Sequence, residues 1–187
     1  MNTTLSNTLW PSMRKSILGR ICLALSGTIL LAISAKVQVP FWPVPVTMQT
    51  FVVLILGITY GSRLGAFTGG LYLLEGAIGL PVFATGSGVM YLLGPTGGYL
   101  VGFAVAMYVV GLLAERKLDR SVFQIIVTML VGEVIIFVFG VGWLARIIGL
   151  EQAISVGLKP FLLVELFSIA LAAATVPILW KKITPKN

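Results

Sequence analysis

The chain has 187 residues, of which 58% are hydrophobic and only 10% are charged, and its mean hydropathy is +1.04. A soluble globular protein is about 25% charged, and a fold of this size has too little interior to bury so much apolar surface, so lipid must cover part of it. The sequence has no histidine and one cysteine. This excludes histidine-assisted serine or cysteine catalysis, histidine-ligated or cysteine-cluster metal sites and internal disulfides, and it argues against an enzyme.

Six apolar segments follow one another along the chain, and a membrane-spanning helix needs about 20 such residues. We therefore predict an all-α, polytopic membrane protein with six transmembrane helices in a single domain, residues 1–187. The second and third segments are short, so a re-entrant hairpin formed by the two is an alternative. The predicted helices are Ile17–Ala35, Val46–Tyr60, Ala66–Leu80, Gly97–Ala114, Ser121–Leu144 and Phe161–Trp180.

The net charge of +7 indicates membrane topology rather than nucleic-acid binding, because the cations lie between the apolar segments and no basic patch is interleaved with aromatic residues. Positive charge concentrates on the cytoplasmic side of membrane proteins. Six crossings place both termini on one side, with residues 1–16 as an N-terminal segment and 181–187 as a tail. The cations of that side are Arg14, Lys15, Arg20, Arg63, Arg116, Lys117, Arg120, Lys181, Lys182 and Lys186, against Lys36, Arg146 and Lys159 opposite. We therefore expect both termini in the cytoplasm and a multi-pass protein of the plasma (inner) membrane.

The loop after the first predicted helix is apolar but cannot be helical. Pro40, Pro43 and Pro45 forbid a continuous helix and fix extended backbone. The adjacent Phe41 and Trp42 are consistent with an interfacial aromatic anchor or with a stiff cap that folds over an outward-facing pocket. Non-helical backbone at membrane depth must be buried in protein or line a cavity, which favours the cap.

The loop before the fourth predicted helix is rich in glycine. Gly86 and Gly88 allow backbone to approach a ligand closely, and Thr96 is predicted to cap the helix that follows. Small residues at four-residue spacing are typical of close helix packing. They occur here as Gly94, Gly98 and Gly102, and on the first helix as Ala24, Thr28 and Ala32, whose partner is either another helix of the chain or another subunit.

Three acidic residues, Glu75, Glu133 and Glu165, lie inside apolar segments. A charged side chain at the bilayer centre costs at least about 2.5–3.5 kcal/mol and usually faces the bundle interior or a wet cavity. We place Glu75 and Glu165 near the outer ends of their helices and Glu133 near the midplane. This pattern predicts a polar pocket in the outer half, with acids that are bonded to neighbouring helices as the alternative.

Several segments resemble the BioY family of biotin transporters, and the similarity extends roughly from Ile29 to Ala174. The segments are VQVPFWPVPVTMQTFVVL (Val37–Leu54), EGAIGLPVFATGSG (Glu75–Gly88), LLGPTGGYLVGF (Leu92–Phe103) and GLLAERKLDRSV (Gly111–Val122).

The resemblance implies the substrate-binding, or S, component of an energy-coupling factor transporter, with six helices and biotin in an outward pocket. It implies no catalytic residue, metal or cofactor. The chain has no nucleotide-binding motif, so the implied partners are a transmembrane coupling subunit and two ATPases, unless the chain acts alone or as a homo-oligomer. By analogy with related S components, Ala24, Thr28 and Ala32 are expected to contact the coupling subunit.

The implied pocket departs from the family pattern on the fifth and sixth helices. The family typically has asparagine after the glycine where this chain has Glu133, and an acid and a lysine where it has Glu165 and Ser168. In the family, that acid and lysine contact the ureido ring and the carboxylate of biotin. The expected substrate-binding residues are Trp42, Gln49, Ser87, Tyr99, Glu133, Glu165 and Ser168.

These departures leave two substrate hypotheses. The first is biotin, with its carboxylate held by Lys36, Lys159 or the N-terminus of the fourth helix. The second is a neutral or cationic ligand with the same ureido-like head, such as a biotin amide, because extra carboxylates would repel an anionic tail. A membrane subunit that serves assembly rather than transport is the remaining alternative.

Overall fold

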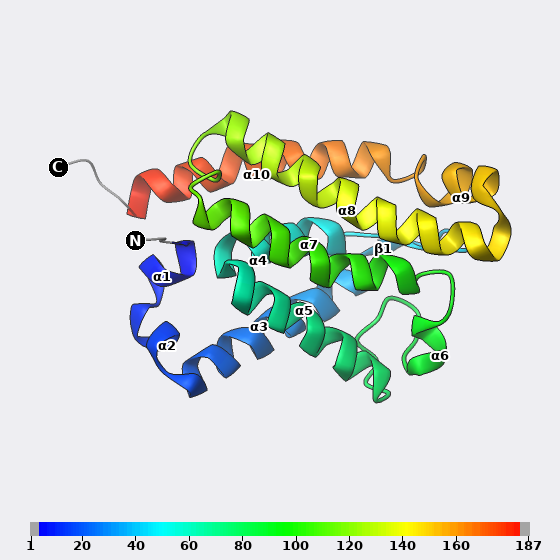
Figure 1. Ribbon diagram of the computed structural model, residues 1–187, viewed down its shortest axis with the longest axis horizontal. Helices are drawn as coiled ribbons and strands as arrows, with labels where there is room; N and C mark the ends of the chain where they lie inside the picture. The colour runs from blue at the N-terminus through cyan, green and yellow to red at the C-terminus, as the bar shows by residue number, and fades with distance from the viewer. Residues whose placement is uncertain (1–3, 184–187) are drawn as a thin grey trace.

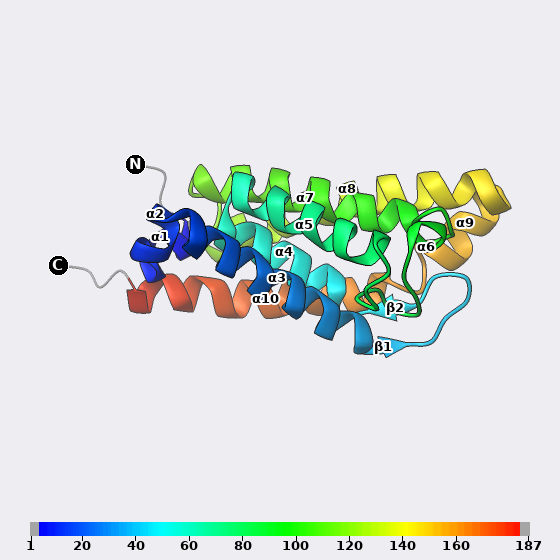
Figure 2. The ribbon, with the colours of Figure 1, turned by 90° about the horizontal axis from the view of Figure 1, so that it is seen from below.

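The computed structural model describes residues 4–183, and its helices run side by side along one long axis (Figures 1 and 2). The described part of the chain is mostly helical, with one short antiparallel hairpin in which Gln38 pairs with Thr47 and Val39 with Val46. Its elements are α1 (Leu5–Leu9), α2 (Pro11–Lys15), α3 (Ile17–Lys36), β1 (Gln38–Val39), β2 (Val46–Thr47), α4 (Gln49–Tyr60), α5 (Ser62–Ala77), α6 (Val89–Leu92), α7 (Gly97–Glu115), α8 (Val122–Ile148), α9 (Leu150–Gly157) and α10 (Leu162–Ile183).

Each of the six predicted segments overlaps one of the longer helices, namely α3, α4, α5, α7, α8 and α10, although α5 begins four residues before its predicted start and α8 ends four residues after its predicted end. By length and composition, three of the described helices can cross a membrane, namely α3, α7 and α8. A fourth span results if α9 and α10, which are bent by 49° at the break between them, are counted together. The chain is therefore a polytopic all-α membrane protein.

The second predicted helix begins later than expected. Val46 and Thr47 belong to β2, and α4 starts only at Gln49 and has 12 residues. At about 1.5 Å per residue, α4 is about 18 Å long, which is shorter than the hydrocarbon core of a bilayer.

The two ends of the bundle differ in structure. The helices α1 and α2 and the C-terminal part of α10 gather at one end, which we call the α1 end, and the hairpin, α6 and α9 gather at the other, the hairpin end (Figures 1 and 2). The predicted terminal segments therefore lie at the same end as far as they are described. Residues 1–3 of the N-terminal segment and residues 184–187 of the tail, including Lys186, lie outside the described residues.

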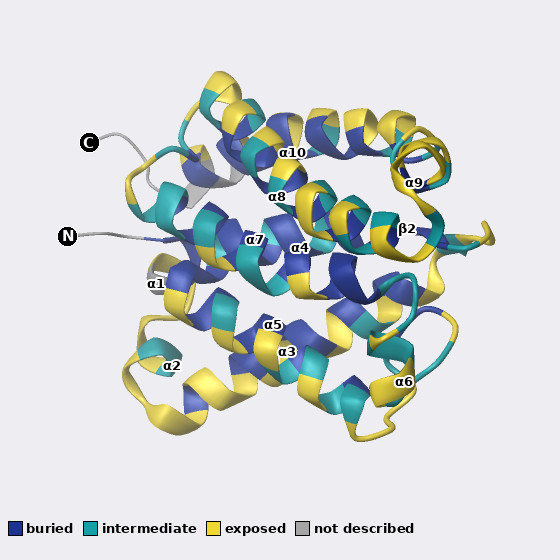
Figure 3. Ribbon diagram, turned by 45° about the vertical axis from the view of Figure 1, so that its right-hand side comes forward, coloured by how far each residue is buried: buried dark blue, intermediate teal, exposed yellow. Residues whose placement is uncertain are grey.

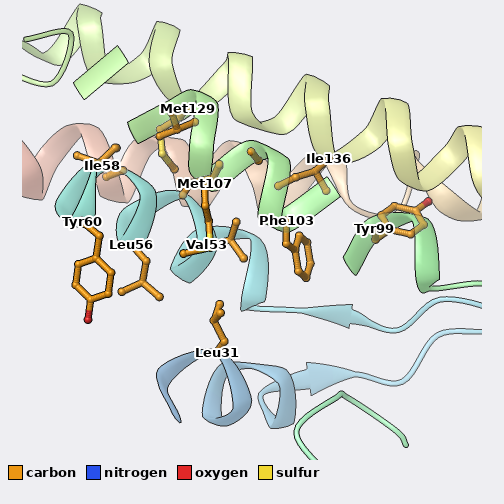
Figure 4. Packing of buried hydrophobic residues seen from close by; sticks show 14 of the residues in the cluster. Leu31, Val53, Leu56, Ile58, Tyr60, Tyr99, Phe103, Met107, Met129 and Ile136 are labelled. Atoms are coloured by element: carbon orange, nitrogen blue, oxygen red, sulfur yellow. The ribbon is translucent and has the colours of Figure 1, made fainter. Parts of the chain in front are cut away.

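The core lies around α7, which contacts α4, α5 and α8. Figure 4 shows Met107 of α7 beside Met129 of α8 and Val53 of α4, all fully buried. The outer faces of the helices are exposed but apolar, for example Leu163 on α10 and Phe123 on α8 (Figure 3). Contiguous apolar surface of this kind belongs in a membrane, as the composition predicts.

Close packing of α7 on α8 depends on two of the glycines singled out by their spacing. A Cβ on Gly98 would lie 2.3 Å from Trp143 Cβ and 2.4 Å from Phe139 O, and one on Gly102 would lie 3.1 Å from Ile136 Cα. The helix-packing interpretation of this spacing is confirmed for both residues. Gly94 precedes α7, and its carbonyl accepts a hydrogen bond from Trp143 Nε1 at 3.0 Å.

At the α1 end, a hydrogen bond and a cation–π contact join the loop between α7 and α8 to α10. Trp180 Nε1 donates to Asp119 Oδ2 at 2.8 Å, and the Arg120 guanidinium lies 3.2 Å above the centre of the Trp180 ring. Asp119 is fully buried, and this burial raises the pKa of its carboxyl group, an effect that its hydrogen bond from Trp180 and the charge of Arg120 oppose.

Candidate substrate-binding site

A small cavity of about 40 Å³ lies at the hairpin end. Small-molecule sites usually measure about 300–1,000 Å³, so the walls must move apart before a ligand of that size can enter. The walls come from the hairpin, α4, the loops around α6, α7, α8 and the start of α10. The lining residues are Val44, Pro45, Thr47, Gln49, Thr50, Ala84, Tyr91, Thr96, Tyr99, Leu100, Phe103, Ile136, Phe137, Phe161 and Glu165.

The proline-rich loop forms one wall of this cavity, as the cap interpretation predicts. Val44, Pro45 and Thr47 all line the cavity, and Val44 and Thr47 are buried. The loop before α6 is joined to the end of α3, because Lys36 Nζ donates to Phe83 O at 2.6 Å, and it is close to the hairpin, because Gln38 Nε2 lies 3.4 Å from Ala84 O. The cap is therefore held by these contacts, by its stiff prolines and by Val44 and Val46, which are buried in the hydrophobic core.

Polar groups gather on the α4 side of the cavity. Gln49 is buried at the first position of α4, and its Nε2 donates to the Tyr72 hydroxyl at 2.8 Å. That hydroxyl in turn donates to Val82 O at 2.8 Å. Thr47 and Thr50 flank Gln49 in the sequence and also line the cavity. This side presents amide and hydroxyl groups to a ligand.

The opposite side is aromatic. Tyr99 of α7 stacks on Phe161 at 6.1 Å between ring centres, and Phe137 of α8 meets both rings edge to face at 6.3 Å and 6.0 Å. The Tyr99 hydroxyl donates to Gly157 O at 2.8 Å, so its ring is fixed in place. Such a group of rings gives a flat apolar wall for a ring-shaped ligand.

Glu165 lines both this cavity and a second hollow, a groove on the outer face between α8 and α10. Glu133 lines the groove but not the cavity. Glu133 is 5% exposed and Glu165 4%, and no hydrogen-bond partner within the described residues reaches any of their four carboxylate oxygens. The two carboxyl groups interact with each other and Glu165 with Thr50, but buried polar groups normally form well-aligned hydrogen bonds, so this pair can accept further donors.

The structure brings three predicted binding residues together at the cavity, namely Gln49, Tyr99 and Glu165. Glu133 lies beside them but faces the groove between α8 and α10. The other three do not line the cavity. The Trp42 side chain is 84% exposed at the tip of the hairpin, Ser87 is half-buried, and Ser168 is buried with its hydroxyl donated to Val164 O at 2.9 Å.

Two further expectations need correction. Glu75 does not line the pocket, because it lies between α3 and α5 and accepts a hydrogen bond from Thr28 Oγ1 at 3.0 Å. The expected coupling surface is largely internal, because Ala24 is 0% and Thr28 2% exposed and only Ala32 is partly accessible. In this structure the small residues of α3 serve packing and bonding within the chain.

Sequence reasoning missed several residues of the cavity. Thr47, Thr50, Phe103, Phe137 and Phe161 line it, although none was predicted to bind substrate. Thr96 also lines it and stands at the N-cap position of α7, but its side chain makes no capping hydrogen bond. In so apolar a sequence a phenylalanine in a cavity wall looks the same as one that faces lipid, so composition carries no signal for these residues.

The family model described as BioY family matches residues 3–185. The chain is 39% identical over 148 residues to "Biotin transporter BioY" of Thermotoga maritima, and the match covers 78% of this chain and 86% of that protein. It is 36% identical over 144 residues to "Probable biotin transporter BioY" of Pyrococcus horikoshii, covering 76% and 85% of the two chains.

The fold is similar to that of a crystal structure described as the S-component for biotin from an ECF-type ABC transporter. The TM-score is 0.70 at 22% identity, and the match covers 87% of this chain and 90% of that one. Taken with the family match and the two relatives, these findings show that the chain belongs to the BioY family.

Proposed function

We propose that this protein is the substrate-binding membrane subunit for uptake of biotin, with six membrane crossings and both termini in the cytoplasm. Membership of the BioY family and relatives named as biotin transporters support this function. On this topology the hairpin end faces the outside. The cavity at that end then lies on the side of the external medium, in the plasma membrane where uptake takes place.

The observation that carries the proposal is the two-sided chemistry of the cavity. Biotin has a bicyclic head with a planar ureido group, whose N–H groups need acceptors and whose C=O group needs donors. Glu165 supplies acceptor oxygens and Gln49 an amide at the polar side, while Tyr99 and Phe161 supply the aromatic wall. A buried carboxylate without a partner gains most from two N–H donors, since hydrogen bonds to charged groups are the stronger kind.

The carboxylate tail of biotin needs a cation near the mouth of the cavity. Lys36 is the better placed candidate, because its ammonium group lies 3.4 Å from Ala84 O, and Ala84 lines the cavity. Lys159 is exposed in the turn between α9 and α10, two positions before Phe161. A neutral or cationic biotin amide remains the second substrate hypothesis, favoured by the two unpartnered acids.

Calorimetric titration of the purified protein with biotin and with biotin amide tests both hypotheses. If biotin is the ligand, it binds more tightly than the amide. Lys36→Ala then weakens biotin binding by about tenfold, which corresponds to about 1.4 kcal/mol, and weakens amide binding less, because the amide loses only the support that Lys36 gives to the cap. A preference for the amide would assign the site to the second hypothesis. Tight biotin binding in both Lys36→Ala and Lys159→Ala would overturn the role of these lysines.

We further propose that transport is energised by a coupling subunit and two ATPases, since the sequence contains no nucleotide-binding motif. Accumulation of biotin in cells with and without the ATPases checks this. Uptake that is equal in both would mean that the chain acts alone or as a homo-oligomer. An assembly role without solute binding predicts no heat on titration with either ligand.

A further inference from the structure

A groove separate from the substrate cavity lies at the α1 end and combines positive charge with apolar surface. Three arginines line it from three different elements, Arg14 from α2, Arg20 from α3 and Arg63 from α5. The remaining lining side chains are apolar. They are Ile17, Ile21, Leu64 and Phe67.

Two of the three arginines keep their positive charge free for a ligand. No hydrogen bond or ion pair joins the side chain of Arg20 or Arg63 to another residue in the described ranges. Glu115 attracts Arg14, and Glu115 Oε1 also accepts from Ser62 N and Ser62 Oγ, each at 2.8 Å. The guanidinium groups of Arg20 and Arg63 thus carry the charge of the groove.

The groove also lies where a lipid headgroup would be. Arg20 is in the first turn of the membrane-capable helix α3, and Arg63 is the second residue of α5. Ile17 is 71% and Phe67 54% exposed, so apolar side chains reach outward beside the charges. Guanidinium groups bind phosphate oxygens in bidentate fashion, and basic pockets between helices on the cytoplasmic side suit anionic headgroups.

We infer that this groove binds one anionic phospholipid, with its phosphate on Arg14, Arg20 and Arg63 and its acyl chains along Ile17, Ile21 and Phe67. The apolar part favours a lipid over free phosphate, which has nothing to place there. The three cations favour an anionic headgroup over phosphatidylcholine, whose choline group they repel. The site does not depend on the substrate of the transporter.

Native mass spectrometry of the purified, detergent-solubilised protein titrated with phosphatidylglycerol or phosphatidylcholine tests this site. The test variant is Arg20→Gln with Arg63→Gln, and the matched control is Arg116→Gln with Lys181→Gln, two exposed cations at the same end that do not line the groove. At about 1 kcal/mol per basic residue, removing two arginines weakens phosphatidylglycerol binding about 30-fold. The control variant keeps wild-type affinity, and phosphatidylcholine is not retained by any of them.

Equal loss of phosphatidylglycerol in the control variant would mean general charge attraction and would overturn the site, as would equal retention of phosphatidylcholine. The site would also be overturned if the test variant kept its phosphatidylglycerol but lost its complex with the coupling subunit. The groove would then bind an acidic protein segment instead of a lipid. Unfolding temperature and biotin affinity are measured for each variant, and both are expected to equal the wild-type values.

Discussion

Glu133 and Glu165 are two acids buried side by side between α8 and α10. Their carboxyl groups interact with each other, and Glu165 interacts with Thr50, but no hydrogen bond of good geometry within the described residues reaches their four oxygens. Burying polar groups whose hydrogen bonds are incomplete costs folding free energy. Such a cost is expected where the groups serve a ligand rather than the fold.

The first prediction concerns Glu133→Gln. This change removes a buried carboxylate, so we expect the free energy of unfolding to rise by about 1 kcal/mol, measured by thermal or denaturant unfolding in detergent. The control is Glu151→Gln, an exposed acid in the first turn of α9, which should change little. A lower unfolding temperature for Glu133→Gln would show that the carboxylate already has a stabilising partner.

The second prediction separates the cavity wall from the apolar outer surface. Phe161→Ala removes a ring that lines the cavity and stacks on Tyr99, and we expect biotin affinity to fall about tenfold, in line with about 1.5 kcal/mol for an aromatic pair. Phe167→Ala, on the exposed face of α10, and Trp42→Ala, at the hairpin tip, should bind biotin as the wild type does. Weaker binding in Trp42→Ala would mean that the hairpin closes over the ligand.

Some of these residues could be predicted from the sequence and some could not. An acid inside an apolar segment is costly, so Glu165 could be predicted to face a pocket from its position alone. The same signal misled for Glu75, because its partner Thr28 lies on another helix and only the fold brings the two together. Trp42 and Phe161 are both apolar aromatics, and nothing in the sequence tells which one faces lipid or solvent and which one the cavity.

Among the elements, the helices were easier to predict than the breaks between them. Twenty or so apolar residues indicate a spanning helix, and α3, α7 and α8 follow that rule. The hairpin could be expected to be non-helical from its prolines, but its pairing through Val46 and Thr47, which shortens α4, depends on contact with β1. The short helix α9 was not predicted, since it starts after Gly149, whose φ of 85° ends α8.

The third prediction tests the contact between α7 and α8. A Cβ on Gly98 would overlap Trp143 and Phe139, so Gly98→Ala should lower the free energy of unfolding by about 1–3 kcal/mol. Gly142→Ala is the matched control on α8, because a Cβ there meets nothing within 4 Å, and it should be neutral or stabilising by up to about 1 kcal/mol. Thermal unfolding in detergent measures both. Equal stability of the two variants would contradict the close packing at Gly98.

At the scale of the whole molecule, the two ends differ in what they carry. The α1 end has a groove with three arginines beside apolar side chains, while the hairpin end has the cavity. The predicted charge asymmetry agrees with this division, since most of the cations lie at the α1 end of the described chain or in its tail. What the sequence could not reveal is the cavity itself, because its walls come from segments far apart in the chain.

The fourth prediction is the orientation of the bundle. With exposed Cys22 replaced by serine, a cysteine at Trp42 should react with a membrane-impermeant maleimide added to intact cells, because the hairpin end faces outward. A cysteine at Arg116 should react only after the cells are permeabilised. The reverse pattern would place the cavity on the cytoplasmic side and would contradict the proposed direction of uptake.

The most direct test of the central claim is a crystal structure of the purified protein with biotin. If the cavity is the biotin site, density for the ureido ring will lie in it between Gln49, Glu165 and the wall formed by Tyr99 and Phe161. The carboxylate tail of biotin will then point toward Lys36. Biotin bound in the groove between α8 and α10, or a cavity left empty at saturating biotin while the ligand sits elsewhere, would contradict it.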